Sequence, residues 1–440
     1  MMKRRPTTFQ TILLGFVAGI LAGAVLLSLP VASNAGAWTP FIESLFTSTS
    51  AICVTGLVVR DTGSYWSGFG QAVILLLIQI GGLGVVTIAA SFAMVSGRRI
   101  SLMQRSTMQS AISAPQVGGI VRLTLFILKG TLMIELIGAV VMLPVFLETY
   151  GAKGVWMAVF HSVSAFCNAG FDILGGEGRI YPSLTAYCDD VLVNSTIMLL
   201  IFIGGIGFLT WDDVRRNGMR FRRYRMQSKV VLVTSSFLIL LPAVLFFLVD
   251  FRDLPLKSRI LASLFQSVSP RTAGYNTVDL SMMGEVSRAV VIVLMLIGGS
   301  PGSTAGGMKT TTFAVLVSNA LATFRRREDV NLYGRRIDGN AVKTAATIMT
   351  MYLVLFFGGA SFICLKEGLP FSKCLFETAS AIGTVGLTLG ITPGLGIASQ
   401  LVLVFLMFFG RVGGLTIIYA ALSDRRTGGS SLPLEGITIG

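Results

Sequence analysis

The stretch Ser380-Ala381-Ile382-Gly383-Thr384-Val385-Gly386-Leu387 decides the fold, because variants of it occur three more times along the chain. The other copies are SAICVTGL at 50–57, SAFCNAGF at 164–171 and VSPRTAGY at 268–275. Their last glycines, Gly56, Gly170, Gly274 and Gly386, lie 114, 104 and 112 residues apart. A unit repeated at a nearly constant period indicates a repeat architecture. Four copies on one chain predict four units arranged as a ring.

Each copy predicts a segment of backbone that can bind a dehydrated cation. Glycine adopts φ > 0 readily, and a backbone of alternating sign turns successive carbonyl oxygens to one side. Four such segments around one axis can replace the water around a cation, as the Thr-Val-Gly-Tyr-Gly loops of potassium channels do. Thr384-Val385-Gly386 is the closest match to that loop. We name the four segments the filter segments, and their carbonyls are the candidate potassium ligands: Cys53, Val54, Thr55, Gly56; Cys167, Asn168, Ala169, Gly170; Arg271, Thr272, Ala273, Gly274; and Gly383, Thr384, Val385, Gly386.

The composition indicates an integral membrane protein. Of 440 residues, 53% are hydrophobic and 13% are charged, whereas soluble domains carry about a quarter charged residues. Long apolar runs at 12–29, 73–95 and 197–209 support this class. Although basic residues at 3–5 precede the first run as in a signal peptide, the run of 18 residues is longer than a typical signal h-region. We therefore expect a retained helix.

The net charge of +14 reflects membrane topology and not binding to nucleic acid. The segments assigned to the cytoplasm hold 23 of the 35 lysines and arginines. This positive-inside bias predicts a multi-pass protein of the cell inner (plasma) membrane with both termini in the cytoplasm, and its basic surface suits anionic membrane lipid. The five cysteines show no C-x-x-C spacing, so we interpret them as space-filling residues and not as metal or redox ligands.

Each repeat is predicted to run as membrane helix, short re-entrant helix, filter segment and second membrane helix. The re-entrant helices are too short, at about ten residues, to cross some 30 Å of hydrocarbon. The fold class is therefore an all-α integral membrane protein with four M1-P-M2 repeats, pseudo-fourfold around a central ion pore. It would have eight membrane-spanning helices plus four re-entrant pore helices. The repeats span 1–100, 101–225, 226–335 and 336–425, and a cytoplasmic tail spans 426–440.

The second membrane helices, expected at 70–95, 190–211, 285–324 and 397–422, each carry glycines that allow close helix packing. The third differs, because five glycines and a proline at 298–307 cannot stay helical at low cost. We interpret it as an intramembrane loop below the filter segments and as a candidate gate. Arg411 lies at a comparable depth, as a charge barrier or as a tether for the loop. The gate residues are Gly298, Gly299, Ser300, Pro301, Gly302, Ser303, Thr304, Ala305, Gly306, Gly307 and Arg411.

Three further polar residues in apolar surroundings receive structural interpretations. Lys309 is expected to reach the inner headgroups, and Glu135 and His161 are expected to be paired or hydrogen-bonded within the bundle. A membrane enzyme would need clustered carboxylates, histidines or cysteines, which a lone His161 with Glu135 does not supply. An alternating-access secondary cation transporter is the alternative function, although its broken helices would come from inverted repeats, whereas these four repeats are direct.

In these segments the sequence resembles the Trk/Ktr/HKT superfamily of cation transporters, in particular its KtrB-type membrane subunits. The resemblance rests on the filter segments, on residues 78–84, on Gly410-Arg411 and on the loop at 298–309, and it covers essentially the entire chain. It implies potassium uptake through a gated single-file pore, with sodium as an activating or coupled (symported) ion and no cofactor in this chain. The four glycines of the filter segments imply selectivity for potassium.

The resemblance also implies partners and a gate. Members form homodimers seated on a cytoplasmic ring of RCK-type, KtrA-like regulatory subunits that bind nucleotide. The intramembrane loop and the arginine of the last helix form the gate, here 298–307 and Arg411. Such a ring would dock on the basic segments 215–229 and 325–336 and on the tail at 430–440.

Overall fold

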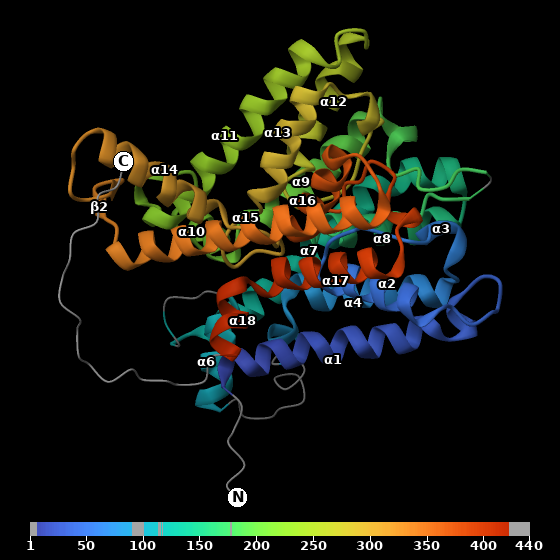
Figure 1. The fold of residues 1–440 in the computed structure, drawn as a ribbon, viewed down its shortest axis with the longest axis horizontal. Coiled ribbons are helices and arrows are strands. Elements are labelled where there is room, and N and C mark those ends of the chain that lie inside the picture. The colour runs from blue at the N-terminus through green and yellow to red at the C-terminus, as the bar shows by residue number, and fades with distance from the viewer. Residues whose placement is uncertain (1–6, 90–100, 113–115, 117, 177, 422–440) are drawn as a thin grey trace, which may run out of the picture.

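The computed structural model of the chain describes residues 7–89, 101–112, 116, 118–176 and 178–421 (Figure 1). The predicted tail at 426–440 and the basic N-terminus at 3–5 lie outside the described residues. The described chain is mostly helical, as predicted. The exception is a hairpin of strands β1 (Asn331–Leu332) and β2 (Arg335–Arg336), which pair antiparallel.

Four long helices are apolar enough to cross a membrane, counted over the residues that the structure describes. Each is 21 to 31 residues long, which exceeds the roughly 20 residues needed for a hydrocarbon core. Their outer faces are apolar and exposed, for example Leu14 and Val25 of the first helix, while Phe16 and Ala24 of the same helix are buried. They are α1 (Thr8–Ser28), α7 (Ile120–Tyr150), α11 (Met226–Val249) and α15 (Gly339–Glu367).

A short helix follows each long one and packs against it. With 12 to 14 residues, these helices reach only about 20 Å and end inside the bundle. Each ends within a few residues of a filter segment, so the negative ends of the helix dipoles lie beside these segments. The short helices are α2 (Phe41–Ile52), α8 (Lys153–Phe166), α12 (Leu256–Val268) and α16 (Phe371–Gly383).

The second membrane helices are broken, so the continuous helices predicted at 70–95, 190–211 and 397–422 are wrong. Gly84, Gly207 and Gly413 have φ of 86°, 90° and 87°, which interrupts a right-handed helix. At Gly207 the chain turns by 98°. The parts before the breaks are α4 (Gly68–Leu83), α9 (Val191–Gly205), α13 (Glu285–Leu296) and α17 (Ile397–Val412). The parts after them are helical residues 85–89, α10 (Phe208–Asn217), α14 (Thr310–Phe324) and α18 (Gly414–Ala421).

The expected close packing at the glycine clusters is confirmed. A Cβ added to Gly81, Gly204 or Gly410 would run into the carbonyl oxygen at the end of the neighbouring short helix. These oxygens belong to Ile52, Phe166 and Ile382, each four residues before a filter glycine. The glycines therefore let the broken helices support the filter segments directly.

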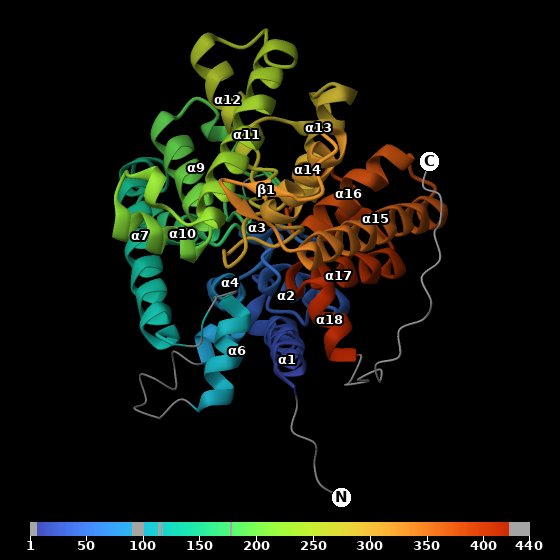
Figure 2. The same ribbon diagram turned by 90° about the vertical axis from the view of Figure 1, so that its left-hand side faces the viewer.

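The helices surround a common centre, which Figure 2 shows from one end of the molecule. In this view α1 and α2 lie below the centre, α7 and α9 to its left, α11 and α12 above it, and α15 and α16 to its right. Helices α10, α14 and α18 and the hairpin lie toward the left end in Figure 1, and α3 (Thr62–Tyr65) lies at the opposite end. Two apolar clusters pack these helices together: the larger contains residues of the first three filter segments, and the smaller contains Val385 of the fourth.

Candidate functional site

The last glycines of the four filter segments form a closed ring. A Cβ built on Gly56 would lie 3.2 Å from Cα of Gly170, and one on Gly170 would lie 3.0 Å from Cα of Gly274. The series continues from Gly274 to Gly386 at 3.1 Å and returns from Gly386 to Gly56 at 3.0 Å. Only glycine fits at these four places, because each neighbouring backbone occupies the volume of a side chain. The sequence repeat thus identified four residues that the fold brings together.

The filter segments share one backbone conformation. Their last glycines have φ of 93°, 67°, 83° and 97° in chain order. The residue two positions earlier also has φ > 0 in every segment, although none of the four is glycine. They are Val54 (58°), Asn168 (59°), Thr272 (75°) and Thr384 (51°). Non-glycine residues adopt this conformation at a cost, so a pattern repeated four times indicates a functional constraint on the carbonyl directions.

Four serines fix the filter segments, and sequence reasoning missed their role. Ser50 Oγ accepts a hydrogen bond from the Gly56 N–H, and Ser380 Oγ accepts one from the Gly386 N–H, both at 3.0 Å. Ser164 donates to the carbonyl of Phe171 at 2.8 Å, and Ser269 donates to that of Tyr275. The available signal was a serine five or six residues before every filter glycine.

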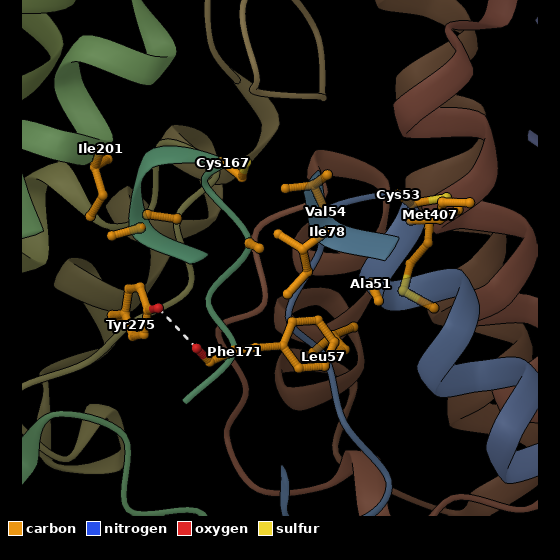
Figure 3. Close-up of a cluster of buried hydrophobic side chains, with 14 of the residues drawn as sticks. Ala51, Cys53, Val54, Leu57, Ile78, Cys167, Phe171, Ile201, Tyr275 and Met407 are labelled. Carbon is orange, nitrogen blue, oxygen red and sulfur yellow. Dashed lines mark hydrogen bonds between the residues drawn. The ribbon is translucent and has the colours of Figure 1, made fainter. Parts of the chain in front are cut away.

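An apolar layer surrounds the segments (Figure 3). The residues that directly follow the glycines, Leu57, Phe171, Tyr275 and Leu387, are at most 1% exposed. The Tyr275 hydroxyl donates to the carbonyl of Phe171 at 2.9 Å and thereby joins two neighbouring segments. This layer restricts motion of the segments and keeps water away from their outer side.

The side chains of several predicted site residues make contacts behind the segments. Asn168 Nδ2 donates to Thr272 Oγ1 at 3.2 Å. The buried Arg271 guanidinium lies 3.4 Å from the carbonyl oxygen of Ser235 and 3.5 Å from that of Gly298. Any ion contact of these residues would therefore come from their backbone. Cys53 is buried, as expected of a space-filling residue.

Three polar side chains make hydrogen bonds within the bundle: Glu135 and His161, as predicted, and also Cys167. Cys167 Sγ contacts Oε1 of Glu135 at 3.8 Å, and Gln79 donates to Oε2 of the same carboxyl group at 3.2 Å. The His161 Nδ1 lies 2.8 Å from the carbonyl oxygen of Met157. These polar groups therefore belong to the packing around the second filter segment.

A cavity of about 290 Å³ opens above the ring, and all four filter glycines line it. Asp61 and Asp172 line the same cavity. Asp61 accepts hydrogen bonds from the N–H groups of Ser64 and Tyr181. Burial, reinforced by the neighbouring charge of Asp61, raises the pKa of Asp172 to about 7. Two carboxyl groups at this mouth can concentrate cations in front of the ring.

A buried carboxyl group supports the fourth filter segment, and sequence reasoning did not single it out. Glu377 of α16 is fully buried. It accepts hydrogen bonds from the hydroxyls of Thr388, at 2.9 Å, and Thr392, in the chain just beyond Gly386. The signal was a glutamate inside a predicted re-entrant helix, where an unpaired carboxylate would be costly.

The intramembrane loop at 298–307 lies in the break between α13 and α14 and is held by backbone hydrogen bonds. Ser300 and Thr304 donate N–H groups to Gly205 and Gly204, at 3.0 and 3.2 Å. Gly307 donates to Gly410 at 3.2 Å, and the N–H of Phe208 donates to Gly302 at 2.7 Å. The loop thus contacts α9, α10 and α17.

The loop also contacts three filter segments. The third segment reaches it through the Arg271 guanidinium, 3.5 Å from the Gly298 carbonyl oxygen. Thr304 Oγ1 lies 3.2 Å from Asn168 Oδ1. A Cβ on Gly306 would lie 3.0 Å from Cβ of Thr384. A change in the loop can therefore reach the second, third and fourth filter segments directly.

Arg411 links the loop to the glycine cluster of α4. Its guanidinium donates to the carbonyl of Thr304 on one side and to those of Gly81 and Gly82 on the other. Lys309 Nζ donates to the carbonyls of Ala305, at 2.8 Å, and Gly306, at 3.3 Å. The expectation that Lys309 reaches the headgroups is therefore wrong: the lysine closes the loop on itself, since its carbonyls need donors in a buried position.

Comparison with known proteins confirms the resemblance inferred from the sequence. The chain matches the TrkH family, described as cation transport protein, over residues 6–426. It is 37% identical to the potassium/sodium uptake protein NtpJ of Enterococcus hirae, covering 100% of this chain and 98% of that protein. It is 36% identical to the Ktr system potassium uptake protein B of Bacillus subtilis, covering 94% and 93%.

Among solved structures, the fold is similar to that of the potassium transporter TrkH from Vibrio parahaemolyticus. The TM-score is 0.74 at 17% identity, covering 95% of this chain and 85% of that one. These relatives are transporters and not enzymes, in agreement with the apolar helices and the ring of glycines. The chain therefore belongs to the TrkH family of cation transport proteins and is an integral membrane protein.

Proposed function

We propose that the protein takes up potassium through a gated single-file pore whose selectivity filter is built from the backbone carbonyls of the four filter segments. The closed ring of Gly56, Gly170, Gly274 and Gly386 carries this proposal, because four backbones with the same dihedral pattern meet around one point. In this proposal the helix groups form four M1-P-M2 repeats in pseudo-fourfold array. The names of the relatives, potassium and potassium/sodium uptake proteins, support potassium as cargo and sodium as a second ion.

The intramembrane loop and Arg411 are the proposed gate. The loop contacts the second, third and fourth filter segments, and Arg411 holds it to α4. A relative named as part of a Ktr system supports a multi-subunit assembly. We propose a homodimer in the plasma membrane, with both termini in the cytoplasm and a ring of nucleotide-binding regulatory subunits docked on that side.

The test compares two glycines that share a strained backbone and differ in their surroundings. At Gly56, a Cβ would lie 2.5 Å from the carbonyl oxygen of Ala169, whereas ordinary contacts begin near 3.4 Å. Gly390 has a similar φ of 82°, and no described atom lies within 4 Å of its Cβ position. Both serine variants bear a backbone cost of about 1–2 kcal/mol, but only Gly56→Ser must displace a carbonyl of the ring.

Uptake of potassium and sodium is measured for both variants in a host that lacks its own potassium transport. Gly56→Ser should raise the sodium-to-potassium uptake ratio about tenfold, while Gly390→Ser should leave the ratio of the parent. Equal sodium-to-potassium uptake ratios in the parent and both variants, at equal expression, would contradict the proposal that this ring is the selectivity filter. Flux under inward and outward gradients separates a pore, which conducts both ways when open, from an alternating-access carrier.

A further inference from the structure

A large basic cavity lies apart from the ring, where α6 (Leu102–Ile112), the start of α7, α10 and the start of α11 meet. Helix α6 packs against α7, and α10 packs against α11. Figure 2 shows this region on the left, with α6, α7 and α10 labelled. The cavity has a volume of about 1100 Å³. Its charged lining consists of Arg105, Arg122, Arg215, Arg216, Arg225 and a single carboxylate, Asp212.

The positive charge of this cavity is not neutralised within the described part of the chain. Asp212 pairs with Arg216 at 2.8 Å and with Arg225 at 3.7 Å, and Asp213, behind the lining, pairs with Arg225 at 3.5 Å. Two carboxylates therefore face the five arginines of the lining. Arg105 and Arg122 form no ion pair with any described residue, and both are exposed. Arginines that lack carboxylate partners and face one cavity favour an anion with several oxygens, such as a phosphate ester.

The N-terminus of α7 adds backbone donors to the same cavity. This helix has 31 residues, and among the described residues no side chain caps its first turn. Gly118 and Gly119 line the cavity, and no described atom lies within 4 Å of a Cβ placed on either. Gly118 and Gly119 are exposed, so this end of the helix borders the cavity, and the N-terminus of a helix favours a phosphate group.

Apolar side chains line the cavity beside the arginines. Leu123, Leu125 and Phe126 come from the first two turns of α7, and Leu209 comes from α10. The guanidinium of Arg215 lies 4.8 Å from the centre of the Phe126 ring. Because α7 is one of the membrane-crossing helices, the arginines lie where its apolar span begins. A soluble phosphate would need no such apolar wall, whereas a phospholipid presents a phosphate and acyl chains together.

We propose that this cavity binds the phosphate headgroup of an anionic phospholipid, with its acyl chains against α7. Two helices that contribute to the lining, α6 and α10, also contact the intramembrane loop. A Cβ on Gly302 would meet the carbonyl of Ile112 at the end of α6, and the first N–H of α10 donates to Gly302. Occupancy should therefore alter potassium flux; this second step rests on the proposed gate, whereas binding of the lipid does not.

Native mass spectrometry of the full-length purified protein tests the binding, with phosphatidylglycerol as probe and phosphatidylcholine as the zwitterionic comparison. The variant is Arg105→Gln with Arg122→Gln, which removes two arginines without breaking any ion pair between described residues. The control is Arg220→Gln with Arg223→Gln, two exposed arginines in the neighbouring segment outside the cavity. The parent and the control should retain phosphatidylglycerol over phosphatidylcholine, and the double variant should bind it about tenfold more weakly.

Three results would overturn the proposal. One is equal retention of the two lipids by the parent, and another is unchanged retention of phosphatidylglycerol by the double variant. The third is thermal stabilisation of the parent by inorganic phosphate but not by phosphatidylglycerol, which would assign the site to a soluble anion. If the double variant does not fold, Arg122→Gln alone serves, and it should lose binding by at least about threefold. If the double variant loses phosphatidylglycerol binding without a change in potassium flux, the lipid site is supported and only its effect on the gate is refuted.

Discussion

Replacement of Arg411 by alanine should raise the maximal potassium flux by loosening the intramembrane loop. The guanidinium joins the carbonyl of Thr304 in the loop to those of Gly81 and Gly82 in α4. Arg411→Ala removes this bridge and also the positive charge below the ring. The loop keeps its backbone bonds to Gly204, Gly205 and Gly410, so it is loosened and not released.

The size of the effect follows from the number of bridges lost. Only one hydrogen bond from Arg411 ends on the loop, and a bond from a charged donor contributes about 1.5–3 kcal/mol. Loss of that amount shifts the ratio of open to closed loop by about 10- to 150-fold. Maximal flux should rise by a factor up to this range, limited by the fraction of open protein in the parent. The sodium-to-potassium ratio should stay unchanged, because the ring lies above the loop.

The assay is potassium flux from proteoliposomes that contain equal amounts of each purified protein. Arg411→Lys separates the bridging role of the residue from its charge. Lysine keeps the positive charge, but its single ammonium group cannot reach the carbonyls on both sides as the guanidinium does. If the bridge closes the pore, the lysine variant should conduct like the alanine variant; if the charge closes it, the lysine variant should conduct like the parent. If correctly folded Arg411→Ala protein showed the same potassium flux as the parent, the proposal that Arg411 holds the loop closed would be refuted.

Three further predictions follow from the cavity above the ring, from the fourth filter segment and from the tail. Because the pKa of Asp172 is raised to about 7, its carboxyl group loses its charge as the external pH falls from 8 to 6, and the KM for potassium uptake should rise about three- to tenfold. Asp172→Asn should have the higher KM at both pH values, and an equal pH dependence of KM in parent and variant would contradict this prediction. Glu377→Ala leaves the hydroxyls of Thr388 and Thr392 without their buried acceptor, so thermal denaturation should show a free energy of unfolding lower by about 2–4 kcal/mol, and the variant should admit sodium. As a control, Glu43→Ala breaks an exposed ion pair with Arg60 and should lower the free energy of unfolding by less than about 1 kcal/mol. Deletion of 430–440 should weaken co-purification with the regulatory subunits while the pore stays folded, and normal co-purification would exclude a docking role for the tail.

The sequence allowed prediction of those features that repeat or that break a strong local rule. Four copies of one motif located Gly56, Gly170, Gly274 and Gly386, which the fold brings into a ring, while their role as ion ligands stays a prediction. Five glycines and a proline at 298–307 are too unfavourable for a helix, so the break there could be foreseen.

The breaks at Gly84, Gly207 and Gly413 were not foreseen, because the glycine clusters around them also suit close packing of an unbroken membrane helix. Their positive φ depends on how the helices pack around the filter segments, which is tertiary information. Likewise, Glu377 finds its partners only after the chain has turned through the fourth filter segment, and Lys309 finds its acceptors only once the loop has closed.

The intramembrane loop has a consequence for how such a protein can be built. A single loop already touches α9, α10 and α17, and it reaches the filter segments through Asn168 and Thr384. Four identical loops could not occupy that space, since each would need the volume that the first one fills. An assembly of four separate, identical subunits therefore could not carry this loop. Joining the four units in one polypeptide permits a single copy, and under the proposed function this departure from symmetry would be what controls the ion path.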